Sequence, residues 1–131
     1  MAKLLQPVNP PSLAKPAGYS HGIEVQGGKM LYVAGQVALD KDGKLVGPND
    51  IGAQTRRVLE NMRRILETGG ASLRDVVKIT VFVTDIRFRE GYGEVRQEFF
   101  GSNPPASTLV QVACLAIPGA LIEIEAVAVI D

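Results

Sequence analysis

The sequence has one cysteine, one histidine and no tryptophan, and its charges cancel. The single thiol, Cys114, excludes an internal disulfide framework, and one cysteine with one histidine cannot form the paired spacings of a zinc site. Fourteen basic and fourteen acidic side chains give a formal net charge of zero. A neutral chain has no general attraction to phosphate backbones or anionic membranes, so nucleic acid is not expected as a partner. The composition fits a reducing compartment, and it implies neither a metal nor an organic cofactor.

Long apolar runs are also missing. No stretch reaches the ~18 consecutive apolar residues of a membrane-spanning helix, and prolines interrupt residues 1–20, which lack a continuous apolar segment of signal-peptide length. We therefore expect a soluble, cytoplasmic protein with no membrane partner. At 131 residues the chain fits a single domain, residues 1–131. A domain of this size buries roughly two-thirds of the surface that its unfolded chain exposes, which is enough for one core.

The first half of the chain contains an arm, two predicted strands and a helix. The prolines of residues 7–18 exclude a helix and indicate an arm or an ordered loop. Residues 23–26 and 30–39 are predicted strands that meet in a hairpin at two adjacent glycines, Gly27 and Gly28. Residues 51–66 place their apolar side chains on one helical stripe, with Asp50 as the N-cap and two glycines at 69–70 as the end.

The second half adds a strand, a helix and two more strands. Residues 76–84 alternate, with Val77, Ile79, Val81 and Val83 on one face. Residues 88–99 repeat apolar side chains at helical spacing between an N-cap at position 85 and a glycine at position 101. Residues 108–114 and 121–130 are the last predicted strands, and Cys114 is expected to be buried at the end of the first. This order predicts an α+β fold in which two helices cover one face of a mixed sheet.

The strand over residues 121–130 carries two carboxylates among aliphatic side chains. Its alternation places Glu123 and Glu125 on one face and Ile122 and Ile124 on the other. A carboxylate on an apolar face reaches solvent, meets a partner or belongs to a site that uses it. Since both faces are largely apolar and two helices cover only one, the uncovered face predicts a homo-oligomer.

Seven segments, in order and spacing over nearly the whole chain, resemble the RidA/YjgF family. They are Gly-Tyr-Ser-His-Gly (18–22), Val-Ala-Gly-Gln-Val (33–37), Gln-Thr-Arg-Arg-Val-Leu-Glu-Asn (54–61), Val-Val-Lys-Ile-Thr-Val-Phe-Val-Thr-Asp (76–85), Phe-Phe (99–100), Pro-Ala-Ser-Thr-Leu-Val-Gln-Val (105–112) and Ile-Glu-Ile-Glu-Ala-Val-Ala-Val (122–129). Each motif is weak alone, but their joint occurrence is specific. The resemblance implies a chorismate-mutase-like α+β fold, a homotrimer, and ligand clefts between neighbouring subunits.

The best-known members of that family hydrolyse reactive enamines and imines to a 2-oxo acid and ammonia. Carried over by position, their water-activating glutamate corresponds to Glu123, and Tyr19, Gly35 and Gln36 also match cleft positions. The arginine that pairs with the substrate carboxylate is replaced by Ser107. Three further cleft residues depart from the family pattern, namely Ala34, Gly93 and Leu109. A hydroxyl cannot reproduce a bidentate guanidinium contact, so the resemblance implies a retained cleft with a changed substrate.

Each candidate residue also has a structural interpretation. Glu123 could instead be a carboxylate satisfied by backbone or by a neighbouring subunit, and Glu125 is interpreted as structural. Ser107 and Thr108 either bind a neutral carbonyl or amide or are solvated strand residues. Tyr19 either closes over a ligand or packs against the arm, and Gly35 taken alone more simply marks a β-bulge.

Two further side-chain patterns do not indicate catalytic or binding sites. Ser20 beside His21 does not indicate a catalytic triad, because adjacent residues do not face each other productively and no strained Gly-x-Ser-x-Gly turn is present. The arginines at 56, 57, 63 and 64 are expected to form a solvated helix face, without the interleaved aromatic side chains of a nucleic-acid site.

Three functions are therefore considered. The first is a small-molecule hydrolase of the imine or enamine deaminase type, with Glu123 as the catalytic residue and Tyr19, Ala34, Gly35, Gln36, Gly93, Ser107, Thr108 and Leu109 around the substrate. The second is a non-catalytic homotrimer that binds a metabolite in the same clefts. The third is a ribonuclease or translation inhibitor, which the zero net charge and the lack of tryptophan disfavour.

Overall fold

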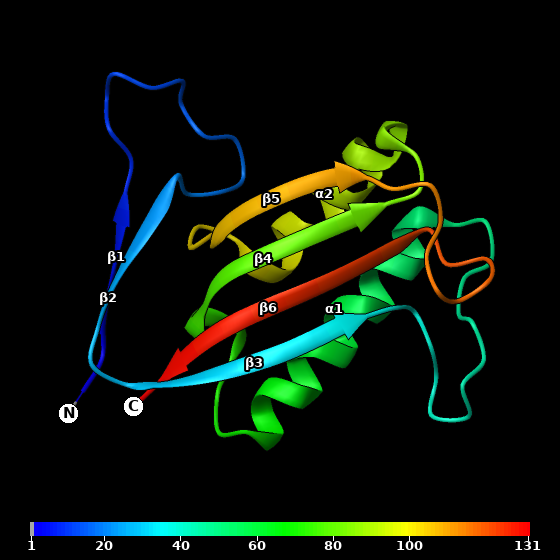
Figure 1. Cartoon of the computed structure of the whole chain (residues 1–131), viewed down its shortest axis with the longest axis horizontal. Helices are drawn as coiled ribbons and strands as arrows, with labels where there is room; N and C mark the ends of the chain where they lie inside the picture. The colour runs from blue at the N-terminus through cyan, green and yellow to red at the C-terminus, as the bar shows by residue number, and fades with distance from the viewer. Residues whose placement is uncertain (1) are drawn as a thin grey trace.

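A computed structural model describes residues 2–131, which form a four-stranded sheet, a separate two-stranded sheet and two α-helices (Figure 1). The strands are β1 (Leu4–Val8), β2 (Gly22–Gln26), β3 (Lys29–Gln36), β4 (Val76–Val83), β5 (Ala106–Gln111) and β6 (Ile122–Ile130). The helices are α1 (Ile51–Thr68) and α2 (Arg89–Phe100). A short 3₁₀ turn, η1 (Leu73–Asp75), comes after α1, and a second one, η2 (Ile86–Phe88), leads directly into α2.

The main sheet has the strand order β3-β6-β4-β5. β4 pairs antiparallel with β6 and parallel with β5, so the sheet is mixed. α1 and α2 lie side by side across one face, and the other face is left uncovered (Figure 1). The predicted α+β fold, with a mixed sheet and two helices on one face, is confirmed.

α1 begins and ends where the sequence predicts. The carboxylate of Asp50 accepts a hydrogen bond of 3.0 Å from the Ala53 N–H and so caps the first turn. At the other end the N–H of Ala71 bonds to the carbonyl of Leu66 at 2.7 Å, while Gly70 has a φ of 83°. This left-handed residue lets the chain fold back over the last carbonyls of the helix and stop it.

β4 and β6 supply most of the sheet side of the core. Ile79, Val81 and Val83 are fully buried beneath the helices, as their alternation predicts. The prediction for Val77 was wrong, because the β4–β6 register shifts between Val76 and Lys78. The shift turns Val76 into the core, 5% exposed, and leaves Val77 only half-buried.

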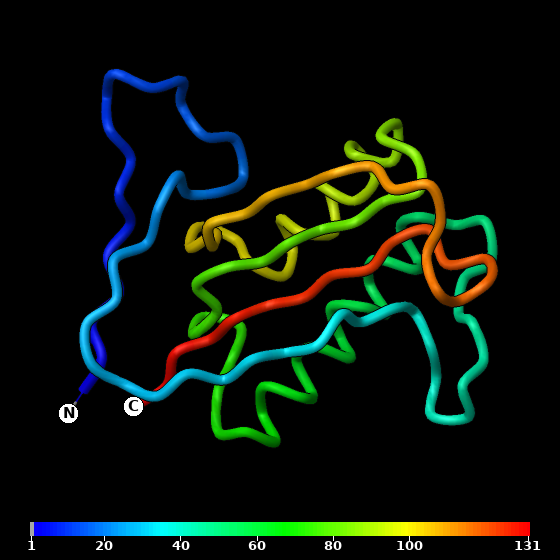
Figure 2. The backbone as a smooth tube through the Cα atoms, in the orientation of Figure 1, coloured from blue at the N-terminus to red at the C-terminus, as the bar shows by residue number. Residues whose placement is uncertain are grey.

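The predicted hairpin between residues 23–26 and 30–39 was also wrong. β2 pairs with β1, and β3 pairs with β6. Gly27 and Gly28 do adopt positive φ values, 71° and 82°, but the resulting turn carries the chain from one sheet into the other. The two-stranded sheet therefore lies beside one end of the main sheet (Figure 2).

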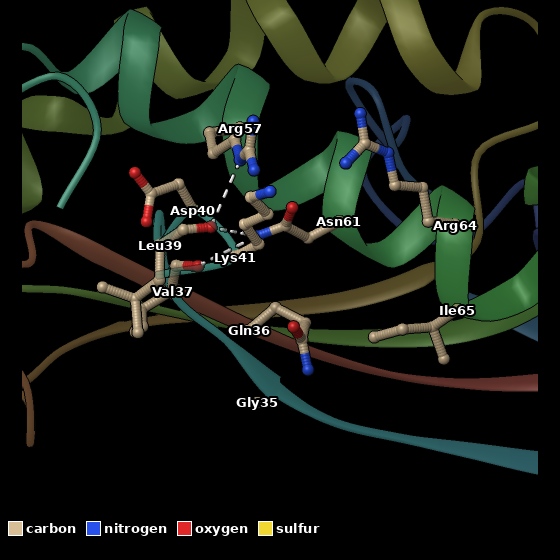
Figure 3. A pocket seen from close by; sticks show the side chains of 10 residues that line it. All are labelled: Gly35, Gln36, Val37, Leu39, Asp40, Lys41, Arg57, Asn61, Arg64 and Ile65. Carbon is tan, nitrogen blue, oxygen red and sulfur yellow. Dashed lines mark hydrogen bonds between the residues drawn. The ribbon is translucent and has the colours of Figure 1, made fainter. Parts of the chain in front are cut away.

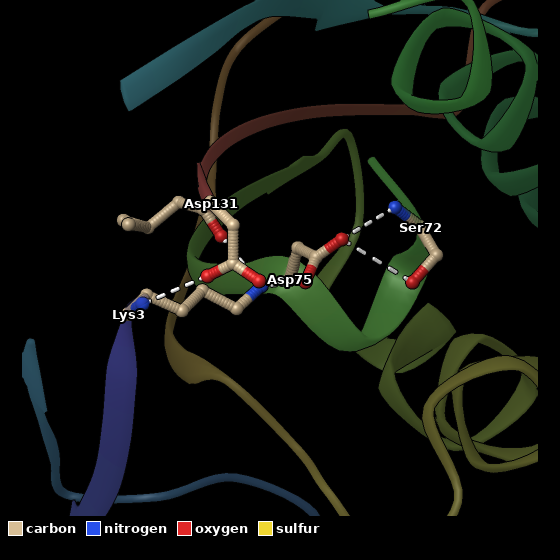
Figure 4. Close-up of polar contacts among 5 residues, drawn as sticks. Lys3, Ser72, Asp75 and Asp131 are labelled. Atoms are coloured by element: carbon tan, nitrogen blue, oxygen red, sulfur yellow. Dashed lines mark hydrogen bonds and ion pairs between the residues drawn. The ribbon is translucent and has the colours of Figure 1, made fainter. Parts of the chain in front are cut away.

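Lys3 fastens this two-stranded sheet to the rest of the molecule (Figure 4). Its ammonium is paired with the Asp75 carboxylate and donates a hydrogen bond of 2.8 Å to the Val129 carbonyl, and its backbone N–H donates to the Asp131 carboxylate at 2.7 Å. The Asp75 carboxylate also accepts a 2.7 Å bond from the Ser72 N–H. Lys3, just before β1, is thus joined both to the turn before β4 and to the end of β6.

The prediction that Cys114 is buried in a strand was wrong. β5 ends at Gln111, and Cys114 follows in an exposed loop. The apolar run of residues 108–114 is longer than the part that pairs with β4, because the partner strand itself ends at Val83. Within residues 2–131, no helix is long and apolar enough to cross a membrane.

Candidate functional site

The Glu123 carboxylate lies over the backbone of Gly35 on the uncovered face of the sheet. Glu123 is placed there by its register opposite Phe82 of β4, on the face opposite to Ile122 and Ile124, which are fully buried. A Cβ added at Gly35 would overlap with one carboxylate oxygen of Glu123 and lie 2.8 Å from its Cδ. The glycine therefore makes room for the carboxylate, at the point where the β3–β6 register is irregular between Val33 and Gln36.

Ala34 and Thr108 also lie on the uncovered face. Ala34 lines a hollow of about 480 Å³ together with Lys78, Thr80 and the exposed Glu125. The Thr108 hydroxyl accepts a hydrogen bond of 2.7 Å from the Lys78 ammonium. Positively charged, negatively charged and hydroxyl groups thus lie among exposed apolar side chains on this face.

A second group of candidate residues lies at the β5 edge, on the side of the sheet that faces the helices. Ser107 and Leu109 pair with the buried Ile79 and Val81, so both side chains point toward α2. With Tyr19 they line a cavity of about 240 Å³, which we call the β5-edge cavity. Its remaining lining residues are Ala17, Ile86, Arg89, Tyr92 and Arg96.

Gly93 borders the same cavity through Arg96. A Cβ added at Gly93 would lie 3.6 Å from a terminal nitrogen of the Arg96 guanidinium, so a side chain longer than alanine would compete for its place. Sequence reasoning did not select Arg96 or Tyr92 as site residues. The available signal was helical spacing, since position 96 lies about one turn after both 92 and 93 on α2.

Gln36 lies apart from both groups. It pairs with the buried Ile124, and its side chain is on the helix side of the sheet, in a hollow of about 400 Å³ beside α1 (Figure 3). There the Asn61 amide and the Arg57 guanidinium donate to the Leu39 carbonyl at 3.0 and 3.2 Å. These bonds hold the loop after β3 against α1, so the polar side chains that line this hollow have a structural role.

The adjacent residues Ser20 and His21 bond to different backbone carbonyls. The Ser20 hydroxyl donates to the Pro104 carbonyl at 3.0 Å, and a ring nitrogen of His21 lies 2.7 Å from the Ala14 carbonyl. The His21 ring also packs edge-on against the ring of Tyr19, with 5.4 Å between the centroids. Both residues therefore help to position Tyr19 at the β5-edge cavity.

The fold brings two sets of candidate residues together. Glu123, Gly35, Ala34 and Thr108 lie on the uncovered face of the sheet, and Tyr19, Gly93, Ser107 and Leu109 lie at the β5 edge on the helix side. Within the described chain, no group of three or more His, Cys, Asp and Glu side chains is arranged to hold a metal ion. The molecule is a small α+β protein with the Glu123 carboxylate on the uncovered face of its sheet and a basic cavity beside the edge strand β5, on the face covered by the helices.

Comparisons with known proteins identify the family. The model of the family described as Endoribonuclease L-PSP matches residues 11–130, and the chain belongs to that family. A RutC family protein of Pyrococcus abyssi is 44% identical over 115 residues, which cover 87% of this chain and 88% of the relative.

Solved structures agree with this assignment. A Rid family protein from Yersinia pestis is 35% identical, with a TM-score of 0.88 over 96% of this chain and 98% of that one. A member of the YjgF/YER057c/UK114 family from Mycobacterium tuberculosis is 38% identical, with a TM-score of 0.69 over 86% and 87% of the two chains. The family resemblance of the sequence motifs is confirmed.

The contact between Gly35 and Glu123 leads to a first prediction. In Gly35→Ala the new methyl group must displace the carboxylate, which is the flexible end of its side chain, so the fold should remain intact. If Glu123 acts in catalysis, a displacement of about 1 Å should lower kcat roughly tenfold to a hundredfold. Turnover and thermal unfolding of the variant would measure the two effects separately, with Gly22→Ala in β2 as the control, because a Cβ added there makes only an ordinary contact of 3.6 Å with the Val8 side chain. Unchanged turnover would contradict a catalytic placement of Glu123.

Proposed function

We propose that the protein hydrolyses small imines or enamines to a carbonyl compound and ammonia, in clefts between the subunits of a homotrimer. The observation that carries the proposal is the Glu123 carboxylate, which lies over Gly35 on a sheet face that a single chain leaves uncovered. Membership of the family supports it.

The chemistry requires one proton acceptor and no redox group. Water adds to the carbon of the protonated C=N group while the Glu123 carboxylate accepts a proton from it, which gives a neutral carbinolamine. Glu123 then returns that proton to the carbinolamine nitrogen. The C–N bond then breaks, ammonia leaves, and the remaining hydroxyl loses its proton to give the carbonyl. An enamine enters the same route after protonation at carbon, which gives the same protonated C=N group.

The placement of the candidate residues supports an assembly. Glu123 and Ala34 lie on the uncovered face, whereas Ser107, Leu109 and Tyr19 lie at the β5 edge on the helix side. One chain does not bring these two groups together. A neighbouring subunit whose β5 edge meets the uncovered face would complete the cleft.

Ser107 alters the specificity that we propose. A guanidinium–carboxylate pair contributes about 1.5 to 3 kcal/mol, and the Ser107 hydroxyl supplies neither its charge nor its two parallel donors. The substrate therefore either lacks the usual carboxylate or has it bound by a different residue.

The proposal is tested with a panel of imines generated by amino-acid oxidases, with ammonia release as the measurement. Faster release in the presence of the protein, dependent on its concentration, is the expected result. Uniform silence across acidic and neutral imines would instead favour the second function, a homotrimer that binds a metabolite without turnover. The departures at Ala34, Gly93, Ser107 and Leu109 are the observations that favour that alternative. Cleavage of RNA is not proposed, because the chain has no net positive charge.

The assembly leads to a second prediction. Tyr32 is 69% exposed and Met30 is 59% exposed, both on the uncovered face, and a monomer rarely leaves such a surface in water. Sedimentation of the wild type should give a trimer at micromolar concentration. Tyr32→Glu should dissociate it, because a charge would be buried without a partner. Lys44→Glu, which adds the same side chain in an exposed loop, should not, and a stable wild-type monomer would contradict the prediction.

A further inference from the structure

The Arg96 guanidinium lies in the β5-edge cavity, and no carboxylate among residues 2–131 forms an ion pair with it. Its central carbon is 5.6 Å from the centroid of the Tyr92 ring, and two glycines leave room for it. A Cβ at Gly18, whose φ is 77°, would overlap the guanidinium, and one at Gly93 would lie 3.6 Å from it. The ion pairs of the described chain, Lys3–Asp75, Arg56–Glu98 and Arg87–Asp85, do not include Arg96.

The buried hydroxyl of Tyr92 is a second unsatisfied group at this place. Tyr92 is 2% exposed, and its hydroxyl has no hydrogen-bond partner among the described residues. Ser107 and Arg96 lie close to the hydroxyl. Burial raises the pKa of Tyr92 to about 12, against the opposing influence of Arg96 and Ser107, so the phenol is a neutral donor at physiological pH. A buried hydroxyl without a partner is costly, and a ligand oxygen would satisfy it.

The charge and size of the cavity define what would fit. Its lining includes two arginines, Arg89 and Arg96, and no carboxylate. The volume of about 240 Å³ admits only a small ligand, and Leu109 and Ile86 supply apolar surface beside the donors. From this arrangement we propose that Arg96 binds the carboxylate of a small 2-oxo or 2-imino acid, with the hydroxyls of Tyr92 and Ser107 as further donors.

This inference rests on the proposed function and names its substrate class. The guanidinium that holds the acid comes from α2 and not from β5, where Ser107 stands. The absence of an arginine at position 107 therefore does not remove acids from the substrate range. Binding by Arg96 instead holds the carboxylate from the α2 side of the cavity. The space between Arg96 and Leu109 then limits the size of the substrate's side chain.

The test is the binding of pyruvate, the product-like 2-oxo acid, to the full-length protein, with neutral pyruvamide as the matched ligand. Arg96→Met keeps most of the aliphatic stem and removes the charge. It should weaken pyruvate binding about tenfold or more, because a charge-assisted bidentate contact is lost, and leave pyruvamide binding within about twofold. Arg56→Met, on the exposed face of α1, should change neither affinity.

A measurement on the wild type covers the case in which the variant does not fold. The side-chain Nε–H resonance of Arg96 should shift on titration with pyruvate and saturate together with the binding isotherm. An unmoved Arg96 resonance, equal affinities of wild type and Arg96→Met, or no saturable pyruvate binding by the wild type would each overturn the inference.

The two proposals fail in different ways. If Arg96→Met loses pyruvate while Glu123→Gln leaves turnover unchanged, the acid site stands and the hydrolase mechanism fails. If Glu123→Gln abolishes turnover while Arg96→Met binds pyruvate normally, the hydrolase stands and the role of Arg96 is wrong.

Discussion

Glu123→Gln should abolish turnover while ligand binding stays within about tenfold of the wild type. Glutamine is nearly isosteric with glutamate and can still hydrogen-bond a ligand, but it cannot accept a proton from water. Loss of a general base lowers the rate of the chemical step, typically about 10²- to 10⁴-fold. Ammonia release from oxidase-generated imines gives kcat, and titration with pyruvate gives the affinity.

The neighbouring Glu125 provides the matched control. It lies two residues further along β6, on the same face, and is exposed. Glu125→Gln makes the same chemical change on the same face of the sheet, at a more exposed position, and should leave turnover within about twofold. If both variants lose activity equally, or if Glu123→Gln only lowers the melting temperature, Glu123 has no place in the mechanism and the binding function becomes the better one.

Gln54→Leu should be the most destabilising of the substitutions considered. Gln54 is fully buried in α1, and its amide donates to the carbonyls of Gly47 and Gly119, both at 3.1 Å. Its side-chain oxygen accepts a bond of 2.8 Å from the N–H of Leu121. Leucine has a similar volume but leaves the Gly119 carbonyl and the Leu121 N–H unpaired, whereas the Gly47 carbonyl still accepts a bond of 3.0 Å from the Asp50 N–H. Each buried unpaired group costs about 1 to 3 kcal/mol.

We therefore expect Gln54→Leu to lower the free energy of unfolding by about 2 kcal/mol or more. Denaturant unfolding measures the change. Gln97→Leu is the control, because Gln97 is exposed on α2 and makes one long bond of 3.4 Å to the Gly101 carbonyl. The control should stay within about 0.5 kcal/mol of the wild type. Equal stability of the two variants would show that the bonds of Gln54 carry little free energy. Since Leu121 precedes the strand that carries Glu123, residual activity should fall as well.

The features that the sequence predicts are those with local causes. Asp50 and Gly70 mark the ends of α1 through bonds within a few residues, and the alternation of β6 separates Ile122 and Ile124 from Glu123 without reference to the rest of the chain. Such patterns are repeated over several residues, so a single irregularity does not hide them.

The features that escape prediction depend on which segments meet. Two positive-φ glycines at 27 and 28 indicate a turn but not that β2 leaves the sheet to pair with β1. The buried Gln54 has a polar side chain on a helix, and only the distant carbonyl of Gly119 and N–H of Leu121 explain its burial. Long-range pairing is set by the topology of the whole chain, which local propensity does not encode.

The same limit applies to the candidate site. The motifs indicate Tyr19, Gly35, Ser107 and Glu123 as one set, whereas the fold divides them between two faces of the sheet. Arg96 could not be selected from the sequence, because an arginine on a helix is ordinarily solvated. Its importance depends on Gly18, which lies 78 positions away in the chain and leaves space for the guanidinium.

If the homotrimer forms as proposed, the division of candidate residues between two faces allows complementation between different mutant alleles. Each cleft would then be a joint product of two polypeptides, and a chain defective at Glu123 could be rescued by a partner defective only at Arg96. A trimer in which one chain has lost both Glu123 and Arg96 would, on average, contain fewer intact clefts than a trimer in which two different chains have each lost one of them. Inheritance of defects in this protein would therefore follow how subunits mix, and two individually inactive alleles could together sustain activity.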